Sequence, residues 1–381
     1  MQSRPNRHFA PPRYWMNDPN GLIYHKGLYH LYYQHNPVAN EFGNISWGHA
    51  TSKDLISWQH HKVALWHDHN LMMYSGCTVV DDDGCICAIY TEHAGAGDVY
   101  NERICLAKSW DDGYTFDRQN REVILEHRDP DFRDPKVFWY EAGQYWVMCV
   151  SLPKQYTILF YKSKNLYNWE LTGQFTNDNF RGRYWECPDL FPLKDDDGSV
   201  KWILTISGQN ADGVTWGMFY FIGDFDGRTF NASGKGESLD WGADFYAGIT
   251  FEGIEERIMM GWCGNWAYAG KLNEVSWSGI MASPRRLKLV KGRVLQELIS
   301  NARIQQLQMK SSYQTLSLEG VTLMWSDAFL KIDRSSSALH FPLENTVVEF
   351  NGYLQALEIS SDCGIIECVI NGGERIFTVR V

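Results

Sequence analysis

The stretch SKNLYNW (163–169), a polar turn followed by a spaced aromatic residue, recurs along the chain and decides the fold. The pattern also reads SKDLISW at 52–58, SWDDGYTF at 109–116 and GDFDGRTF at 223–230, so the unit repeats roughly every 50 to 60 residues. A repeat of this length suits a propeller blade of four strands, because kelch-type blades run to about 50 residues. The strand-rich part of the chain therefore predicts about five blades.

The sequence around these turns is patterned as short strands. Runs such as LYHLYY (28–33) and YWVMCV (145–150) are typical of buried or half-buried strands. We expect an all-β fold, with a five-bladed β-propeller over residues 1–293 and a shortened, compact β-sandwich over 311–381. The segment 294–310 is expected to be a linker, and its run VLQELISNARIQQLQ favours a short helix there.

Composition excludes several partners and cofactors. The chain has 46 acidic and 35 basic residues and a formal net charge of −11, so it offers no broad basic surface for nucleic acid or an anionic membrane. The nine cysteines include no C-x-x-C pair, which argues against a zinc site and a disulfide framework. The first thirty residues lack the apolar region of a signal peptide, so we expect a cytoplasmic protein. We also expect the protein to use no metal and no cofactor. The sequence does not indicate the oligomeric state.

Three carboxylates stand in unusual, turn-rich settings: Asp18 in WMNDPNG (15–21), Asp134 in FRDP (132–135) and Glu186 in YWECPDL (184–190). Glycoside cleavage uses such groups, one to attack the anomeric carbon and another to protonate the leaving oxygen. We expect aromatic neighbours to desolvate Glu186 and favour its protonated form, and amide donors to keep Asp18 ionised. Proline after Asp18 and Asp134 is expected to hold both residues in extended geometry.

These motifs, taken in order, carry a resemblance to a known family. Together with YYQHNP (32–37), WGHATSKDLISW (47–58), YSGC (74–77) and DFYA (244–247), they resemble glycoside hydrolase family 32, the β-fructofuranosidases. That family includes invertases, sucrose-6-phosphate hydrolases, levanases and inulinases. The resemblance covers about 290 residues and implies a five-bladed propeller with a central active site, followed by a β-sandwich.

The resemblance also implies roles for individual residues. Asp18 resembles the nucleophile of a retaining enzyme, Glu186 the general acid/base and Asp134 the transition-state stabiliser. The residues that resemble the sugar-contacting shell are Asn17, Gln34, Trp47, Tyr74, Ser75, Arg133, Asp244 and Trp266. For double displacement, the carboxyl groups of Asp18 and Glu186 are expected to lie about 5 to 5.5 Å apart. The implied partner is sucrose, sucrose 6-phosphate or a short fructo-oligosaccharide.

Three alternatives remain open at this point. A fructosyltransferase would use the same intermediate and resolve it with a sugar instead of water. An arabinan- or xylan-acting propeller glycosidase would use a similar scaffold and typically invert. A catalytically silent sugar-binding propeller would keep the cavity without turnover, although a pure binder has no use for an acid/base pair.

Overall fold

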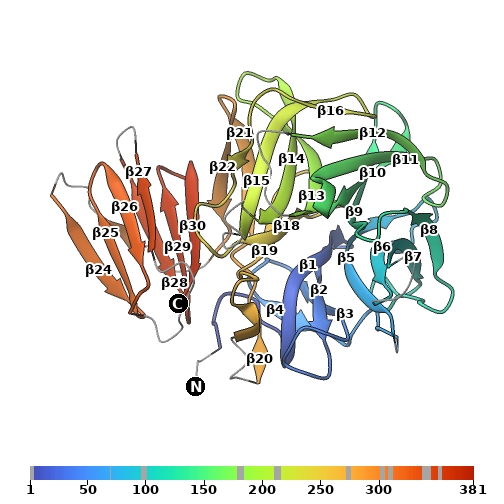
Figure 1. The fold of residues 1–381 in the computed structure, drawn as a ribbon, viewed down its shortest axis with the longest axis horizontal. Coiled ribbons are helices and arrows are strands. Elements are labelled where there is room, and N and C mark those ends of the chain that lie inside the picture. The colour runs from blue at the N-terminus through green and yellow to red at the C-terminus, as the bar shows by residue number, and fades with distance from the viewer. Residues whose placement is uncertain are drawn as a thin grey trace.

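The computed structural model describes the chain in ten segments, which are residues 4–68, 70–95, 101–177, 184–209, 216–271, 276–300, 305–307, 312–336, 345–350 and 354–381. In these residues the regular structure is β-strand, apart from two short 3-10 turns, η1 (Pro153–Gln155) and η2 (Ala269–Lys271). Figure 1 shows the strands in two bodies, a propeller formed by most of the chain and a sandwich at the C-terminus. The all-β expectation is confirmed.

Five sheets form the blades of the propeller, and their strands pair antiparallel except for β20, which joins β1 in parallel. Blade 1 has the order β20-β1-β2-β3-β4, with β1 (Tyr14–His25), β2 (Leu28–Asn36), β3 (Ser46–Ser52), β4 (Trp58–His60) and β20 (Trp277–Ser278). Blade 2 consists of β5 (Met72–Val80), β6 (Ile86–His93), β7 (Glu102–Ser109) and β8 (Glu122–Glu126). Blade 3 consists of β9 (Arg133–Tyr140), β10 (Tyr145–Leu152), β11 (Thr157–Ser163) and β12 (Glu170–Thr176).

The remaining two blades follow the same plan. Blade 4 consists of β13 (Tyr184–Lys194), β14 (Val200–Gln209), β15 (Trp216–Phe225) and β16 (Phe230–Ala232), and β17 (Glu237–Ser238) adds to β15. Blade 5 consists of β18 (Tyr246–Thr250), β19 (Ile258–Trp262), β21 (Arg285–Val290) and β22 (Arg293–Leu298). The repeat predicted from the spaced aromatic residues therefore corresponds to one blade.

The first strand of each blade lies innermost, and these strands form a closed ring. In ring order, β1 contacts β5, β5 contacts β9, β9 contacts β13, β13 contacts β18 and β18 contacts β1. Apolar side chains fill the space between neighbouring blades, as where Ile89 of blade 2 shares a buried cluster with Val137 of blade 3. A rigid ring of this kind brings residues that are distant in sequence to one axis.

The parallel pairing of β20 with β1 ties a late segment of the chain to the first blade. Tyr14 pairs with Trp277 and Trp15 pairs with Ser278. The segment that carries β20 leaves blade 5 between β19 and β21 and returns to it afterwards. The first blade is therefore completed by residues that follow blades 2 to 4 and the first two strands of blade 5 in the sequence.

The C-terminal body is a sandwich of two four-stranded sheets. One sheet has the order β23-β28-β29-β30, with β23 (Gln305–Leu307), β28 (Leu357–Ser361), β29 (Ile365–Ile370) and β30 (Arg375–Arg380). The other consists of β24 (Gln314–Leu318), β25 (Val321–Trp325), β26 (Phe329–Asp333) and β27 (Asn345–Glu349). Both sheets contribute to one apolar cluster, in which Leu323 and Ile332 of one sheet lie with Ile366 and Phe377 of the other.

The helical linker expected over 294–310 differs from the structure. Residues 294–298 belong to β22, where buried Val294 and Gln296 alternate with more exposed neighbours, and residues 305–307 form β23 of the sandwich. The segment is rich in strong helix formers, but pairing with β21 overrides that local preference. The last blade thus extends to Leu298, beyond the expected boundary at 293. Residues 299–300 belong to neither strand, and residues 301–304 and 308–310 lie outside the described residues.

Buried charges join the propeller to the sandwich. His8 lies between Asp362 and Glu367 of the sandwich, at 3.0 and 3.3 Å. Arg285 of blade 5 forms a fully buried ion pair with Asp240 at 2.7 Å and donates to Thr378 of β30 at 2.6 Å. Polar groups that satisfy one another across an interface fix its geometry, because separating them would leave charges buried without partners.

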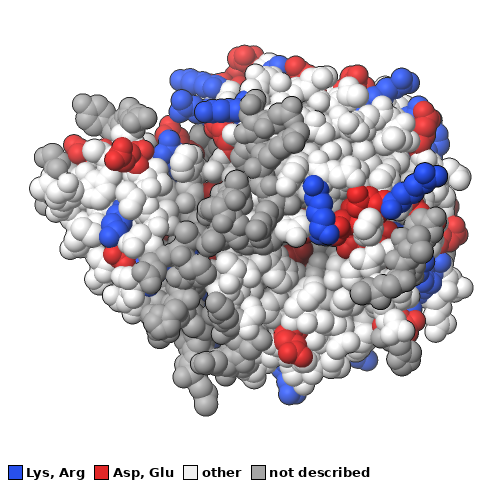
Figure 2. All heavy atoms as spheres, viewed as in Figure 1, with Lys and Arg blue, Asp and Glu red and all other residues white. Residues whose placement is uncertain are grey.

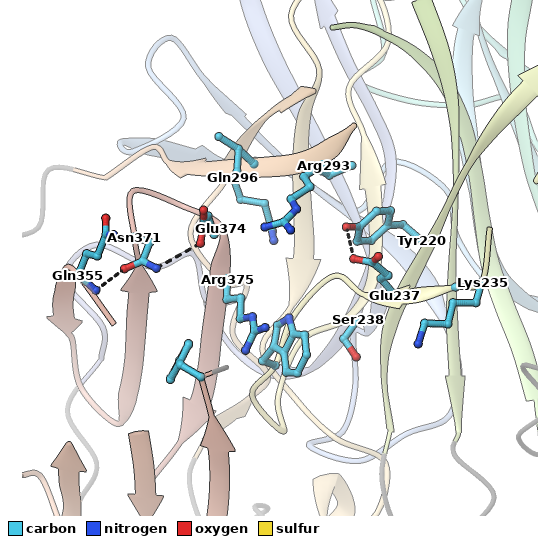
Figure 3. A pocket seen from close by; sticks show the side chains of 15 residues that line it. Tyr220, Lys235, Glu237, Ser238, Arg293, Gln296, Gln355, Asn371, Glu374 and Arg375 are labelled. Atoms are coloured by element: carbon cyan, nitrogen blue, oxygen red, sulfur yellow. Dashed lines mark hydrogen bonds between the residues drawn. The ribbon is translucent and has the colours of Figure 1, made fainter. Parts of the chain in front are cut away.

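A cavity of about 750 Å³ opens between the two bodies, and Figure 3 shows it from close by. Arg293 and Tyr220 of the propeller line one side, while Asn371 and Arg375 of the sandwich line the other. The guanidinium of Arg375 lies over the ring of Trp241, 4.2 Å from its centroid. None of the three predicted catalytic carboxylates lines this cavity, so it is separate from the site described below.

The charged surface is mixed in sign. Figure 2 shows a patch of acidic side chains over the propeller with basic side chains on either side of it. Within the described part of the chain, no helix has the length and apolar character needed to cross a membrane.

Candidate active site

Each of the five innermost strands carries an extra residue opposite its neighbour, and β1 carries a second one at Asn20–Ile23. The five corresponding bulges lie at Met16–Pro19, Met73–Gly76, Arg133–Lys136, Glu186–Asp189 and Tyr246–Ile249. A bulge bends its strand and redirects the side chains at that point. Asp18, Asp134 and Glu186 all lie within or at the edge of a bulge, which explains how three blades present a carboxylate at the same level.

The backbone at three of these bulges is left-handed, including Ala247 in the bulge of blade 5 with a φ of 53°. Asp134 has a φ of 64° and Cys187 a φ of 48°. The expectation that Pro135 would hold Asp134 in extended geometry is therefore wrong. The bulge dictates the conformation instead, and Asp tolerates it better than most residues. Strained backbone of this kind is often found at functional sites.

Asp18 is held by three neighbouring side chains. Its Oδ1 accepts a hydrogen bond from Asn17 Nδ2 at 3.1 Å, and its Oδ2 accepts from Ser75 Oγ at 2.7 Å and from Gln34 Nε2 at 3.3 Å. Asn17, Gln34 and Ser75 are 0, 4 and 4% exposed. The structure thus brings these three predicted sugar contacts together, and they fix the orientation of the Asp18 carboxylate. Asp18 itself is 7% exposed.

Burial and crowding shift the titration of two carboxyl groups. Burial raises the pKa of Asp18 to about 6; the hydrogen bond from Ser75 opposes this shift, and the charge of Glu186 adds to it. Burial also raises the pKa of Asp134, against the attraction of Arg133, and the charges of Glu186 and Asp18 raise it further. Asp18 was expected to stay ionised because of its amide donors, but the donors only partly offset its burial.

Glu186 contacts polar groups where aromatic ones were expected. Its Oε1 accepts hydrogen bonds from Arg133 Nε at 3.1 Å and Nη2 at 3.0 Å. Its Oε2 accepts from the hydroxyl of Tyr246 at 2.5 Å. The side chain is 17% exposed, the most open of the three carboxylates, so it remains accessible to a substrate.

Cys187 connects the three carboxylates, because its backbone amide contacts Asp134, its thiol contacts Asp18 and its neighbour in the chain is Glu186. Its amide donates to Asp134 Oδ2 at 2.9 Å, and its thiol lies 3.5 Å from the same oxygen and 3.8 Å from Asp18 Oδ2. Because Cys187 follows Glu186 directly, these contacts tie the position of Glu186 to the other two groups. The motif WECPDL contains Cys187, but the sequence did not indicate this role.

Aromatic residues form a wall beside the carboxylates. Trp266 packs on Trp15, with ring centroids 6.1 Å apart, and contacts Phe42 edge-on at 5.4 Å. Phe42 also lies 6.0 Å from the ring of Tyr74 and is 40% exposed. Trp266 and Tyr74 were predicted as sugar contacts and are partly exposed here. Phe42 was not predicted as a sugar contact. The sequence feature that could have indicated it is an aromatic residue in a polar loop before a strand.

Two predicted sugar contacts lie away from this surface. Trp47 is fully buried in the core between blades 1 and 2, where its Nε1 donates to the carbonyl oxygen of Tyr74 at 3.0 Å. Asp244 is also fully buried and accepts hydrogen bonds from Arg334 Nη1 at 2.6 Å and from the Arg380 amide at 2.7 Å. Both arginines belong to the sandwich segment, so Asp244 serves the interface between the bodies. In the motif DFYA, the residue that reaches the carboxylates is Tyr246.

Arg133 is the remaining predicted residue, and it lies at the centre of the charged groups. It contacts Glu186 as described and also forms an ion pair with Glu102 at 2.8 Å, with its side chain 14% exposed. Glu102 lies on β7 and was missed, because nothing in the local sequence NERICLAKS marks it as unusual. The assembled site thus holds an anchored aspartate, an accessible glutamate, a second aspartate and an arginine, a set suited to acid/base and nucleophilic chemistry.

Comparison with known proteins gives one family and several relatives. Residues 8–299 match the family described as "Glycosyl hydrolases family 32 N-terminal domain". A levanase of Bacillus subtilis (strain 168) is 40% identical over 308 residues, covering 75% of this chain and 45% of the levanase. The chain therefore spans less than half the length of that relative.

Two further comparisons cover nearly the whole chain. A sucrose-6-phosphate hydrolase of Escherichia coli is 34% identical over 430 residues, covering 99% of this chain and 89% of that protein. A solved fructofuranosidase variant of Schwanniomyces occidentalis, complexed with fructosylnystose, superposes with a TM-score of 0.89 at 26% identity, covering 100% of this chain and 91% of that one. The expected propeller and sandwich are thus found in a known structure.

Proposed function

Because the chain belongs to glycosyl hydrolase family 32, we propose that it is a retaining β-fructofuranosidase that releases terminal fructosyl units. The observation that carries this proposal is the meeting of Asp18, Asp134 and Glu186 at bulges of three blades, linked by the contacts of Cys187. The relatives named levanase and sucrose-6-phosphate hydrolase support the fructoside class.

In the first step, Asp18 attacks the anomeric carbon of fructose while Glu186 donates a proton to the leaving oxygen. Ser75, Gln34 and Asn17 hold the attacking carboxylate in one orientation, which reduces the ordering needed at the transition state. The step forms a covalent fructosyl-enzyme and frees the rest of the substrate.

In the second step, Glu186 removes a proton from water, which attacks the same carbon and releases Asp18. Positive charge develops on the fructose ring in both transition states. The carboxylate of Asp134 lies beside both groups and stabilises that charge, a contribution that is large in a site shielded from water. We expect the substrate to be sucrose, sucrose 6-phosphate or a short fructo-oligosaccharide, each of which carries a terminal fructosyl unit.

The direct test is product analysis from sucrose, sucrose 6-phosphate, kestose and inulin. We expect fructose from at least one of them and, when methanol is added, methyl β-fructofuranoside as the trapped product of retention. Methyl α-fructofuranoside would indicate inversion, and longer oligosaccharides at high sucrose would indicate transfer. Activity on an aryl arabinofuranoside without activity on any fructoside would contradict the proposal.

We also propose that the protein works in the cytosol. Seven of the nine cysteines are buried thiols, which suits a reducing compartment. Fractionation of the source cells tests this point, and recovery of the protein from the medium would contradict it.

A further inference from the structure

Glu102 is a buried carboxylate beside the proposed active site. It begins β7 and is 1% exposed. Both of its oxygens accept hydrogen bonds from Arg133 Nη1, at 2.9 and 2.8 Å. Its Oε2 also accepts from the backbone amide of Phe132 at 2.9 Å, and its Oε1 lies 3.2 Å from His93 Nδ1.

Arg133 therefore contacts Glu102 and Glu186 on different edges of its guanidinium group, and its Nη1 also lies 3.4 Å from Asp131 Oδ1. Nη1 faces Glu102, whereas Nε and Nη2 face Glu186. The planar guanidinium presents its five N–H groups in a fixed fork, so the contact on one edge determines the direction of the other edge. Glu102 thus sets where Arg133 can meet Glu186.

We propose that Glu102 is a positioning residue for the hydrolysis, which acts through Arg133 on the proton carried by Glu186. The proposal rests on the proposed function. General-acid catalysis requires Glu186 to hold a proton at the working pH, and an arginine at 3.0 Å opposes this by stabilising the ionised carboxylate. Glu102 counters the arginine, because its negative charge takes up part of the positive charge that Glu186 would otherwise experience.

Other charged or titratable groups face this set from every neighbouring strand. Those around Glu186, Arg133 and Glu102 are Asp18 on β1, Tyr74 on β5, His93 on β6, Asp131 before β9, Asp134 on β9, Cys187 on β13 and Tyr246 on β18. Asp131 is itself paired with Lys154 at 2.6 Å. The substitution below changes none of these groups, so the effect of Glu102 can be measured against a constant background.

The test is Glu102→Gln, which keeps the shape and one acceptor oxygen but removes the charge. The positive charge of Arg133 then acts on Glu186 without a competitor, and the ionised form of Glu186 is favoured. We expect the alkaline limb of kcat/KM for sucrose to move down by about one pH unit. Activity on a nitrophenyl β-fructofuranoside should change less, because that leaving group needs little protonation.

Glu92→Gln is the matched control. Glu92 lies on β6 of the same blade, is fully buried, and pairs with Arg103 at 2.6 Å and Arg121 at 2.5 Å. It makes the same kind of buried ion pair without contacting Arg133, so it should leave the pH profile in place. A profile for Glu102→Gln that superimposes on that of the wild type, or an equal shift in Glu92→Gln, would overturn the proposal.

A second measurement separates this inference from the proposed function. If the wild-type protein releases no fructose from any fructoside, the proposed function fails, and the titration of Glu186 is followed directly by carboxyl 13C NMR, with Glu186→Gln to assign its signal. Glu186 should then lose its proton at lower pH in Glu102→Gln than in the wild type. An unchanged midpoint would refute the coupling between the two residues.

A second variant covers the case in which Glu102→Gln does not fold. Glu102→Asp keeps the charge but shortens the side chain, so it should leave the alkaline limb near its original place. We expect it to lower kcat by about tenfold with KM unchanged, since Arg133 then shifts relative to Glu186. A kcat equal to that of the wild type would overturn the positioning role.

Discussion

The backbone amide of Cys187 donates a hydrogen bond to Asp134 Oδ2 at 2.9 Å. This bond joins the second and third carboxylates of the site, because Glu186 is the neighbour of Cys187 in the chain. The donor is main chain, so the connection survives a change of the cysteine side chain.

Replacing Cys187 with alanine should therefore have little effect on turnover. The thiol is a weak donor at 3.8 Å from Asp18, and the main-chain bond to Asp134 remains. We expect kcat on sucrose to change by about threefold or less, measured as initial fructose release. A loss of a hundredfold or more would show that the sulfur itself takes part.

The acid limb of the pH profile should report Asp18. Its pKa is raised to about 6 by burial, and only the ionised carboxylate can attack carbon. We expect kcat/KM to rise with pH through about 6 and to reach a plateau before the alkaline limb. A limb near pH 4, the ordinary range of an aspartate, would mean that another group controls the acid side.

Asp18→Asn should stabilise the protein while abolishing turnover. A carboxyl group whose pKa is raised on folding binds its proton more tightly in the native state, so above pH 6 the native state bears an energetic cost. Removing the charge should raise the free energy of unfolding at pH 7 by up to about 3 kcal/mol. Turnover should fall by about four orders of magnitude.

Thermal unfolding at pH 7 and at pH 4 tests this trade. The increase in the free energy of unfolding should be present at pH 7 and largely absent at pH 4, where the wild-type Asp18 is already protonated. An equal change at both values would point to altered packing instead of charge. Retained activity on sucrose would refute the nucleophile assignment.

Phe42→Ala should weaken substrate binding without affecting stability. The ring is 40% exposed and packs against Tyr74 and Trp266 beside the carboxylates, where it can stack on a sugar. An aromatic contact is worth about 1 kcal/mol, so we expect KM for kestose to rise about fivefold. The exposed Trp110, 73% exposed on blade 2, offers a control variant, Trp110→Ala, which should leave KM unchanged.

His8→Gln should destabilise the protein in a pH-dependent way. Burial alone would lower the pKa of His8, but the hydrogen bonds and charges of Asp362 and Glu367 outweigh it and raise the pKa to about 9. A histidine whose pKa is raised on folding contributes its full stabilisation when the pH lies below its pKa in the unfolded state, near 6.5. The stabilisation is lost as the pH rises through its pKa in the folded state, about 9.

The decrease in the free energy of unfolding caused by His8→Gln should therefore reach about 3 kcal/mol at pH 6 and become smaller toward pH 9.5. Melting temperatures of the wild type and the variant across this range check the prediction. A constant difference between the two curves would mean that His8 acts through packing and not through its charge.

The repeat and the motifs carry most of the fold and the core of the site. The spaced aromatic turn recurs in blades 1 to 4, and its spacing set against the length of the strand-rich part predicted about five blades. The motifs around Asp18, Asp134 and Glu186 predicted residues that do meet. The structure was harder to predict where tertiary pairing overrides local preference. Residues 294–298 favour a helix by composition but pair with β21 as a strand.

The positions of the predicted site residues that lie away from the carboxylates have a common physical cause. A motif shows which residues are unusual but not which way the strand turns them, and bulges decide that direction. Trp47 and Asp244 therefore proved buried, whereas Tyr246, two residues after Asp244, reaches Glu186. Glu102 stands in no motif, since its partner Arg133 lies on another blade and only the folded ring brings them together.

The parallel pairing of β20 with β1 has a consequence for biosynthesis. As the nascent chain leaves the ribosome, Tyr14 and Trp15 emerge early, but their partners Trp277 and Ser278 follow more than two hundred residues later. The first blade must wait with an unpaired edge while the next blades are synthesised. A premature stop before β20 would leave that edge permanently open, a form that chaperones and proteases are expected to intercept.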